Sequence, residues 1–319
     1  MSKPDLLLVG KATPRMSERL AEQFTVHPLP SGADRAAFLA EMAPKIAYCC
    51  TTAGIETAVM DALPNLKIVS SFGVGYDSID AAHAAKKGII VTHTPNVLND
   101  EVANTAILLW FATARKLPAY DRYVRDGRWE REGATPLTSS TQGRTVGILG
   151  LGRIGQAIAD RLAVFGATPV YHSRSKKDVP YKYYPDLTEM ARDSDVLICI
   201  TPGGPETKHI VSAQVIDALG PEGILVNVAR GSVVDEAAMV KALQEGRLGG
   251  AGLDVFEEEP KVPSALFGME NVTLQPHVGS ATNETRRAMG DLTCDNLFQF
   301  LKDGTAITPV PECAHLVGR

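Results

Sequence analysis

The stretch TVGILGLGRIGQ, residues 145–156, decides the fold of the chain around it. An apolar run, TVGIL, comes directly before three glycines with the spacing GxGxxG, and the helical pattern RIGQAIADRLAVF follows at once. Such glycines allow a tight turn, close approach of a pyrophosphate and close packing of helix on strand. We therefore interpret Gly150, Gly152 and Gly155 as a dinucleotide-binding turn, and we favour this over a tight turn without a ligand.

The basic stretch HSRSKK, residues 172–177, occupies the place where such a domain usually carries an acidic residue. That place is Ser173, followed by Arg174. A carboxylate would repel a 2′-phosphate, whereas a hydroxyl can donate to it and a guanidinium can bind it with a charge-assisted fork. The pair predicts NADP(H) as the cofactor. Lys176 and Lys177 either add attraction for the phosphate or are solvated loop charges.

Apolar runs of strand length alternate with helical patterns along most of the chain, which is typical of parallel α/β domains. Residues 100–129 resemble one helix, with Asp100 as its cap, that fades into a polar loop. Four strands are expected before this segment, at residues 6–9, 46–50, 67–71 and 88–93. Six are expected after it, at residues 145–149, 168–172, 195–200, 224–228, 251–255 and 271–275. Six strands suffice for a complete doubly wound nucleotide domain, so a different α/β unit precedes it.

The composition of the chain indicates which binding partners and which cellular compartment to expect. The 319 residues carry a formal net charge of −5, which gives no global attraction to nucleic acid or to an anionic membrane. No apolar run is long enough to span a bilayer, and the N-terminus does not resemble a signal peptide, so we expect a cytoplasmic protein. The five cysteines are scattered and lack metal-ligand spacing, which predicts reduced, mostly buried thiols and no metal site.

Chemically reactive side chains follow three of the later strands, where ligands of a doubly wound sheet bind. Arg230 follows ILVNVA, Asp254 and Glu259 lie in GLDVFEEEP, and His277 follows NVTLQP. Taken singly, each has an ordinary structural explanation. Together they suit reduction of a 2-oxo acid: Arg230 can bind the carboxylate, His277 can protonate the carbonyl, and Glu259 can favour the protonated imidazole.

These motifs give the chain a resemblance, over nearly its full length, to the D-isomer specific 2-hydroxyacid dehydrogenases. The resemblance implies a fold of two doubly wound parallel-sheet domains: a flavodoxin-like substrate domain at residues 1–99 and 285–319, and a Rossmann nucleotide domain at residues 100–284. It implies that the last helix packs on the first domain. The matching stretches are SSFGVGYDSID, TVGILGLGRIG, NVARGSVVDE, GGAGLDVFEEEP and QPHVGSAT.

The resemblance also assigns roles to residues. It implies that Arg230, Glu259 and His277 are catalytic and that the backbone amides of Val74 and Gly75 join Arg230 in binding the substrate carboxylate. Asp254 is the implied partner of the nicotinamide carboxamide. Other implied cofactor contacts, besides the three glycines, Ser173 and Arg174, are Arg153, Ile154, Thr201 and Val228.

Within the family, YHSRSKK and YKYYPDL resemble NADPH-dependent reductases of glyoxylate, hydroxypyruvate and hydroxyphenylpyruvate. We expect reduction of glyoxylate and hydroxypyruvate to D-2-hydroxy acids. Bulkier acids, such as aryl-pyruvates or 2-ketogluconate, are an alternative, as is a non-catalytic, nucleotide-sensing corepressor. The resemblance implies a homodimer built around the nucleotide domains. Trp129 either reaches into the partner's site or packs under its own loop.

Overall fold

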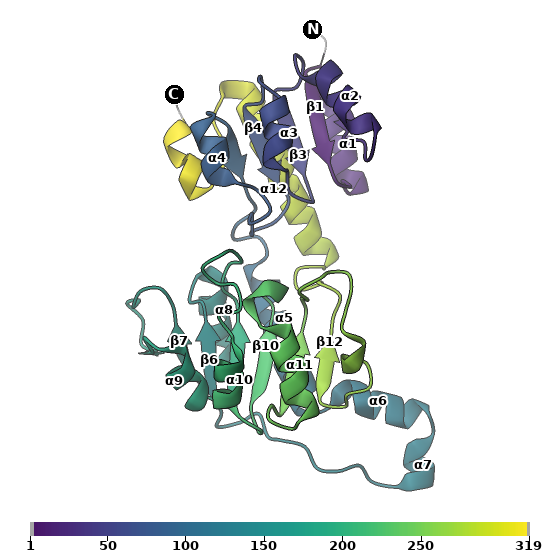
Figure 1. Cartoon of the computed structure of the whole chain (residues 1–319), viewed down its shortest axis with the longest axis vertical. Coiled ribbons are helices and arrows are strands. Elements are labelled where there is room, and N and C mark those ends of the chain that lie inside the picture. The colour runs from purple at the N-terminus through teal and green to yellow at the C-terminus, as the bar shows by residue number, and fades with distance from the viewer. Residues whose placement is uncertain (1–2, 318–319) are drawn as a thin grey trace. The chain divides into compact units, whose positions relative to one another are not determined.

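The computed structural model of the protein describes residues 3–317, which form two compact units (Figure 1). One unit contains the chain up to Leu98 and again from Ala281 onward, and the other runs from Asn99 to Ser280. The sequence places these breaks after residues 99 and 284. In the structure the first break comes just before α5, which begins at Asn99, and the second comes just before α12, which begins at Asn283. Each of these helices therefore lies wholly within one unit.

The first unit is built around a five-stranded parallel sheet with the order β2-β1-β3-β4-β5, which is the flavodoxin-like order. Four strands coincide with the predicted apolar runs. The fifth, β2, was not predicted because it is a half-exposed edge strand without an apolar run. The strands are β1 (Asp5–Val9), β2 (Thr25–Pro28), β3 (Tyr48–Thr51), β4 (Ile68–Ser71) and β5 (Ile90–Thr92).

Three helices of this unit begin after residues whose side chains accept backbone N–H groups. Thr13, Asp80 and Thr282 cap α1, α4 and α12 in this way. Helix α12 packs against β4, where the Ser70 hydroxyl donates to the carbonyl of Thr293 at 2.8 Å. The helices are α1 (Pro14–Gln23), α2 (Asp34–Met42), α3 (Thr57–Ala62), α4 (Ala81–Lys86), α12 (Asn283–Asp303) and the 3₁₀ helix η3 (Pro311–Leu316).

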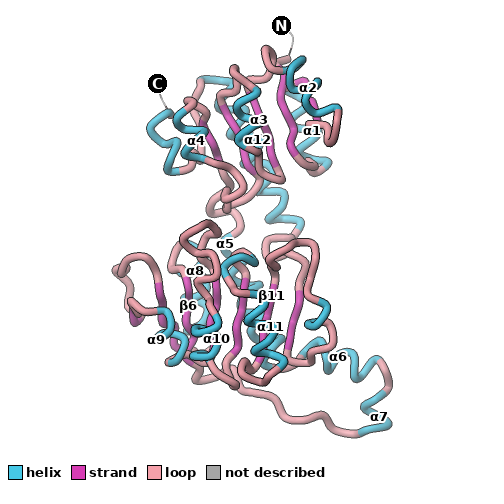
Figure 2. The backbone as a smooth tube through the Cα atoms, in the orientation of Figure 1, coloured by secondary structure: helices cyan, strands magenta, loops and turns pink. Residues whose placement is uncertain are grey.

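The second unit contains a seven-stranded parallel sheet with the order β12-β11-β10-β9-β6-β7-β8 (Figure 2). Counted from β6, this is the Rossmann order with one further strand at the edge, so the predicted fold class is confirmed. All six predicted strands are present, and a short edge strand, β8, was missed. The strands are β6 (Thr145–Leu149), β7 (Thr168–His172), β8 (Lys182–Tyr183), β9 (Val196–Cys199), β10 (Ile224–Asn227), β11 (Gly250–Leu253) and β12 (Val272–Leu274).

The prediction of one capped helix fading into a loop over residues 100–129 was wrong in two respects. Helix α5 begins one residue earlier, so Asp100 lies in its first turn and pairs with Arg161 at 2.7 Å instead of capping it. Two further helices, α6 and α7, occupy the expected loop. The helices of this unit are α5 (Asn99–Ala114), α6 (Leu117–Arg125), α7 (Arg128–Glu132), α8 (Arg153–Val164), α9 (Leu187–Arg192), α10 (Ala213–Leu219) and α11 (Glu236–Gln244), with 3₁₀ turns η1 (Gly231–Val233) and η2 (Ser264–Leu266).

Each unit has its own hydrophobic core, made mainly by the strands and the inward faces of the covering helices. All five cysteines are buried and unpaired, as predicted. Within residues 3–317, no helix is long and apolar enough to cross a membrane.

Candidate active site

The turn between β6 and α8 has the shape that the three glycines allow. Gly150 has a φ of 103°, and a Cβ there would lie 2.8 Å from the backbone nitrogen of Thr201. A Cβ on Gly155 would collide with the Gly150 carbonyl, whereas one on Gly152 would meet no atom within 4 Å. Gly150 and Gly155 therefore permit a tight turn and close helix packing, and Gly152 leaves open space beside the helix start. This combination suits the approach of a pyrophosphate.

The N-terminus of α8 provides donors for that anion. Gly152 precedes the helix and has no capping side chain, and the following residues of the first turn are Arg153 and Ile154. The N–H groups of a first helical turn have no partner within the helix, and the helix dipole favours negative charge beside them. Arg153 is exposed and Ile154 is half-buried. The residues present therefore fit the phosphates of a dinucleotide.

Ser173 and Arg174 follow β7, next to β6 in the sheet. The Ser173 hydroxyl donates to the carbonyl of Ser175 at 2.7 Å, so its proton is already engaged. Arg174 is exposed, and among residues 3–317 its guanidinium has no hydrogen-bond or salt-bridge partner. Arg174 is consequently the stronger candidate for binding a 2′-phosphate.

Two more predicted cofactor contacts follow the carboxyl ends of β9 and β10. Thr201 follows β9 and lies against Gly150, at the point where the order of the strands reverses. Val228 follows β10, is 7% exposed, and donates its N–H to the carbonyl of Cys199 at 3.2 Å. Thr201 therefore lies at the switch point where doubly wound sheets bind nucleotides, and Val228 follows the neighbouring strand at the same edge of the sheet.

Arg230 is positioned by the turn that follows β10. The buried Asn227 holds this turn, because its amide donates to the Arg230 carbonyl at 2.9 Å and its oxygen accepts from the N–H of Ala229 at 3.1 Å. A Cβ on the next residue, Gly231, would collide with the Phe256 carbonyl. Only glycine therefore lets the Arg230 turn pack directly on the loop that carries Glu259.

Glu259 and His277 form a hydrogen-bonded pair across the loops that follow β11 and β12. The His277 Nδ1 lies 2.8 Å from one carboxylate oxygen of Glu259, and the other oxygen accepts the N–H of Phe256 at 3.1 Å. The His277 side chain is 48% exposed and that of Glu259 is 35% exposed, so the pair is accessible to a substrate. Since Nδ1 faces Glu259, Nε2 is the ring nitrogen left to exchange a proton with a bound molecule.

Asp254 anchors the loop that presents His277. Its buried carboxylate accepts the N–H groups of Val278 at 2.7 Å and Gly279 at 2.8 Å, and its carbonyl accepts the N–H of His277 at 2.7 Å. Burial raises the pKa of Asp254 above its ordinary value, and the two N–H donors oppose that shift. A carboxylate has about four acceptor sites, so these bonds leave room for a further donor such as an amide.

A second histidine–carboxylate pair was missed by sequence reasoning. His209, in the loop after β9, lies 2.8 Å from Glu257, and Glu236 accepts the Glu257 N–H at 3.1 Å. Asn227 was likewise missed. The position of Asn227 at the end of a buried strand was a usable signal, whereas nothing in the sequence links His209 to a residue 48 positions away.

The predicted substrate-binding amides, Val74 and Gly75, belong to the first unit and follow β4. The Val74 carbonyl contacts the His93 Nδ1 at 2.9 Å, and the Gly73 carbonyl accepts the N–H of Thr94 at 2.8 Å. Within the described part of the chain, the N–H groups of Val74 and Gly75 have no acceptor. They are thus available to an anion, and their role stays a prediction.

Comparison with known proteins places this architecture among oxidoreductases. Residues 107–279 match the family model described as D-isomer specific 2-hydroxyacid dehydrogenase, NAD binding domain. Glyoxylate/hydroxypyruvate reductase A of Arabidopsis thaliana is 52% identical over 260 residues, covering 81% of this chain and 83% of its own. Hydroxyphenylpyruvate reductase of Plectranthus scutellarioides is 51% identical over 261 residues, covering 82% and 83%. The crystal structure of an NADPH-dependent glyoxylate/hydroxypyruvate reductase from Sinorhizobium meliloti, in complex with NADP and malonate, is 50% identical, with a TM-score of 0.93 and 98% of both chains covered.

Proposed function

The chain belongs to the D-isomer specific 2-hydroxyacid dehydrogenase family, and we propose that it is an NADPH-dependent reductase of small 2-oxo acids, including glyoxylate and hydroxypyruvate. The observation that carries this function is the 2.8 Å pair of Glu259 and His277, in the same unit as the glycine turn. Relatives named as glyoxylate/hydroxypyruvate reductases support the substrate class, and the Sinorhizobium meliloti enzyme, solved with NADP, supports the cofactor.

In this mechanism the bound NADPH supplies the hydride. Arg230 binds the substrate carboxylate through its guanidinium fork, aided by the N–H groups of Val74 and Gly75. The Nδ1–H of His277 donates to Glu259, and Nε2 gives its proton to the carbonyl oxygen as that oxygen gains negative charge. Glu259 stabilises the imidazolium before transfer and fixes the ring orientation.

Preference for NADPH rests on the loop after β7. Arg174 offers a charge-assisted contact to a 2′-phosphate, and no carboxylate stands at position 173 to repel it. Asp254 is the proposed acceptor for the nicotinamide carboxamide. The remaining proposed contacts come from the three glycines and from Arg153, Ile154, Thr201 and Val228.

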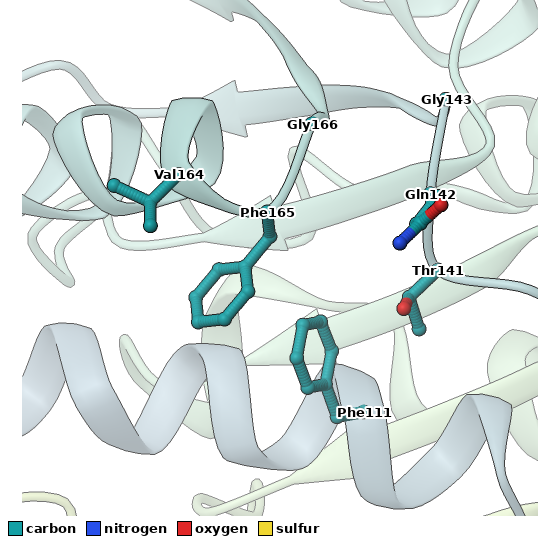
Figure 3. A pocket seen from close by; sticks show the side chains of 7 residues that line it. All are labelled: Phe111, Thr141, Gln142, Gly143, Val164, Phe165 and Gly166. Carbon is teal, nitrogen blue, oxygen red and sulfur yellow. The ribbon is translucent and has the colours of Figure 1, made fainter.

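We also propose a cytoplasmic homodimer that associates through the second unit. Helices α6 and α7 bury none of their residues and extend away from the seven-stranded sheet (Figure 1). Trp129 is 64% exposed instead of packing under its own loop, and Leu137 is 99% exposed. An open hollow near the end of α8 adds Phe111 and Phe165, whose side chains point toward one another (Figure 3). Large apolar side chains that stay exposed on elements of the second unit support an interface between subunits there.

Initial rates of NADPH oxidation with a panel of 2-oxo acids test the proposed function. Glyoxylate and hydroxypyruvate should be reduced efficiently. A clear preference for aryl-pyruvates, as the similarity to hydroxyphenylpyruvate reductase allows, or for 2-ketogluconate would indicate the bulkier substrate class. Binding of NADPH without turnover of any acid would indicate a nucleotide-sensing protein.

A further inference from the structure

We propose that Tyr171, Tyr181 and Tyr183 hold the loop of residues 173–177 in the shape that binds a 2′-phosphate, so that these tyrosines are positioning residues for cofactor choice. The inference rests on the proposed NADPH dependence. The inference goes beyond the proposed function because it gives a role in cofactor discrimination to side chains that support the loop backbone. These are distinct from the side chains that would contact the phosphate.

Tyr171 closes the loop from within. It lies on β7, is 0% exposed, and its hydroxyl accepts the backbone N–H of Lys177 at 2.8 Å and donates to the Lys177 carbonyl at 3.2 Å. Both backbone polar groups of Lys177 are therefore fixed by one hydroxyl. The five residues between the two ends become a closed turn anchored to the sheet.

Tyr183 fixes the start of the same loop. Its hydroxyl donates to the carbonyl of Ser173 at 3.3 Å, and its ring packs 5.3 Å from that of Tyr171. The two tyrosines are register partners in the pairing of β7 with β8. The short edge strand β8 thus serves to place a second hydroxyl under the loop.

Tyr181 connects the returning chain to the helix that begins at the glycine turn. Its hydroxyl donates to the Asp160 carboxylate at 3.0 Å and accepts from the amide of Gln156 at 3.1 Å. Both partners lie on α8. The chain that returns from the basic loop is consequently attached to the same helix whose first turn is proposed to bind the pyrophosphate.

These contacts order the loop backbone while leaving its cationic side chains exposed. Arg174 and Lys176 have no hydrogen-bond or salt-bridge partner among the residues that the structure describes, and the Lys177 ammonium contacts only the Ser175 hydroxyl, at 3.5 Å. A loop ordered before binding loses less conformational entropy when the anion arrives. Removing a hydroxyl behind the loop should therefore weaken binding of the 2′-phosphate and spare the rest of the nucleotide.

The test is the variant Tyr171→Phe, with 2′,5′-ADP and 5′-ADP as probes in isothermal titration calorimetry. We expect the Kd of 2′,5′-ADP to rise about 3- to 10-fold, which corresponds to the net contribution of about one hydrogen bond. The Kd of 5′-ADP should stay within about twofold. The KM for NADPH should rise by a similar factor with kcat unchanged. Tyr183→Phe, which removes a single bond to the loop, should act in the same direction.

Tyr184→Phe is the matched control. Its hydroxyl contacts Asp193 at 2.6 Å and the Lys182 ammonium at 2.6 Å, outside the basic loop, so both probes should bind normally. Equal weakening of both probes by Tyr171→Phe, or no weakening at all, would overturn the inference. Arg174→Ala separates failure of this inference from failure of the proposed NADPH site. If Arg174→Ala also weakens both probes equally or neither, the proposed NADPH site is wrong. If Arg174→Ala weakens 2′,5′-ADP alone and the tyrosine variants do not, only the role of the tyrosines is refuted.

Discussion

At the scale of single residues, His277 shows how the fold holds a reactive side chain in a costly conformation. Its φ of 54° lies in the left-handed region, which costs a non-glycine residue about 1–3 kcal/mol. The three hydrogen bonds to Asp254 from consecutive backbone N–H groups offset this cost and fix the direction of the imidazole. Asp254 therefore serves the proposed proton transfer without touching the reacting atoms.

Replacing His277 by alanine should lower kcat about 10²- to 10⁴-fold, because general acid catalysis typically contributes that factor. The Kd for NADPH should be nearly preserved. His209→Ala is a suitable control, since it removes the other histidine–carboxylate pair of this unit and should lower kcat far less. A similar loss in both variants would point to disruption of the loops instead of proton transfer.

The role of Glu259 is tested by Glu259→Gln, which keeps an oxygen for the Phe256 N–H and removes the charge beside His277. Without the anion, the imidazolium is less stable, so the basic limb of the pH profile for reduction should move to lower pH. The comparison is with Glu257→Gln, which alters the neighbouring pair. An unmoved basic limb in Glu259→Gln would remove Glu259 from this role.

Arg174→Ala should raise the Kd for NADPH at least about tenfold, which corresponds to about 1.4 kcal/mol, and leave that for NADH nearly unchanged. Ser173→Ala should have a smaller effect, because the Ser173 hydroxyl already donates to Ser175. Fluorescence titration of each reduced cofactor measures both constants. Equal losses for NADPH and NADH would contradict a contact to the 2′-phosphate.

At the scale of elements, the contact of α1 with α12 has a pH dependence that can be derived. Hydrogen bonds from Arg15, at 2.8 and 3.1 Å, and from Arg19, at 2.9 Å, hold the pKa of Asp291 below its ordinary value. The unfolded chain therefore binds a proton on this carboxylate at a higher pH than the folded chain does. The stabilisation is present above the ordinary carboxyl pKa of about 4 and is lost as the pH falls through the folded-state pKa.

Asp291→Asn should accordingly lower the free energy of unfolding by about 1 kcal/mol at pH 7, since the pairs are only partly buried. The difference from the parent should shrink as the pH falls below about 4. Urea unfolding followed by circular dichroism at several pH values measures this. Asp121→Asn, which breaks a pair within α6, is the control, and a difference that stays constant with pH would contradict the assignment.

Elements that bury a continuous apolar run could be predicted from the sequence, and short or exposed ones could not. The strands β1 and β6 are apolar after their first residue, whereas the edge strands β2 and β8 expose much of their length. The glycine turn and the residues after β10 and β12 could be located because a parallel sheet brings its carboxyl ends to one edge. Contacts such as Gly231 against Phe256 depend on loop paths that no local pattern encodes.

At the scale of the whole molecule, the proposed active site requires recognition of a carboxylate. A guanidinium fork at Arg230 and N–H donors at Val74 and Gly75 would leave an aldehyde or simple ketone without partners. A site built for a polar group rejects analogues that lack it far more strongly than it distinguishes one methylene. Discrimination against non-acids should therefore be sharp, and discrimination among side chains of 2-oxo acids should be weak.

The last prediction concerns the product formed from hydroxypyruvate. In the proposed site the cofactor is bound at the glycine turn and His277 is the proton donor. Hydride and proton should therefore reach the carbonyl from fixed directions, which yields a single enantiomer. Membership of the D-isomer specific family predicts that this product is D-glycerate. Chiral chromatography of the product, with commercial D- and L-glycerate as standards, decides the matter. A racemic product would show that the substrate is not held in one orientation, and L-glycerate would show that the hydride reaches the opposite face.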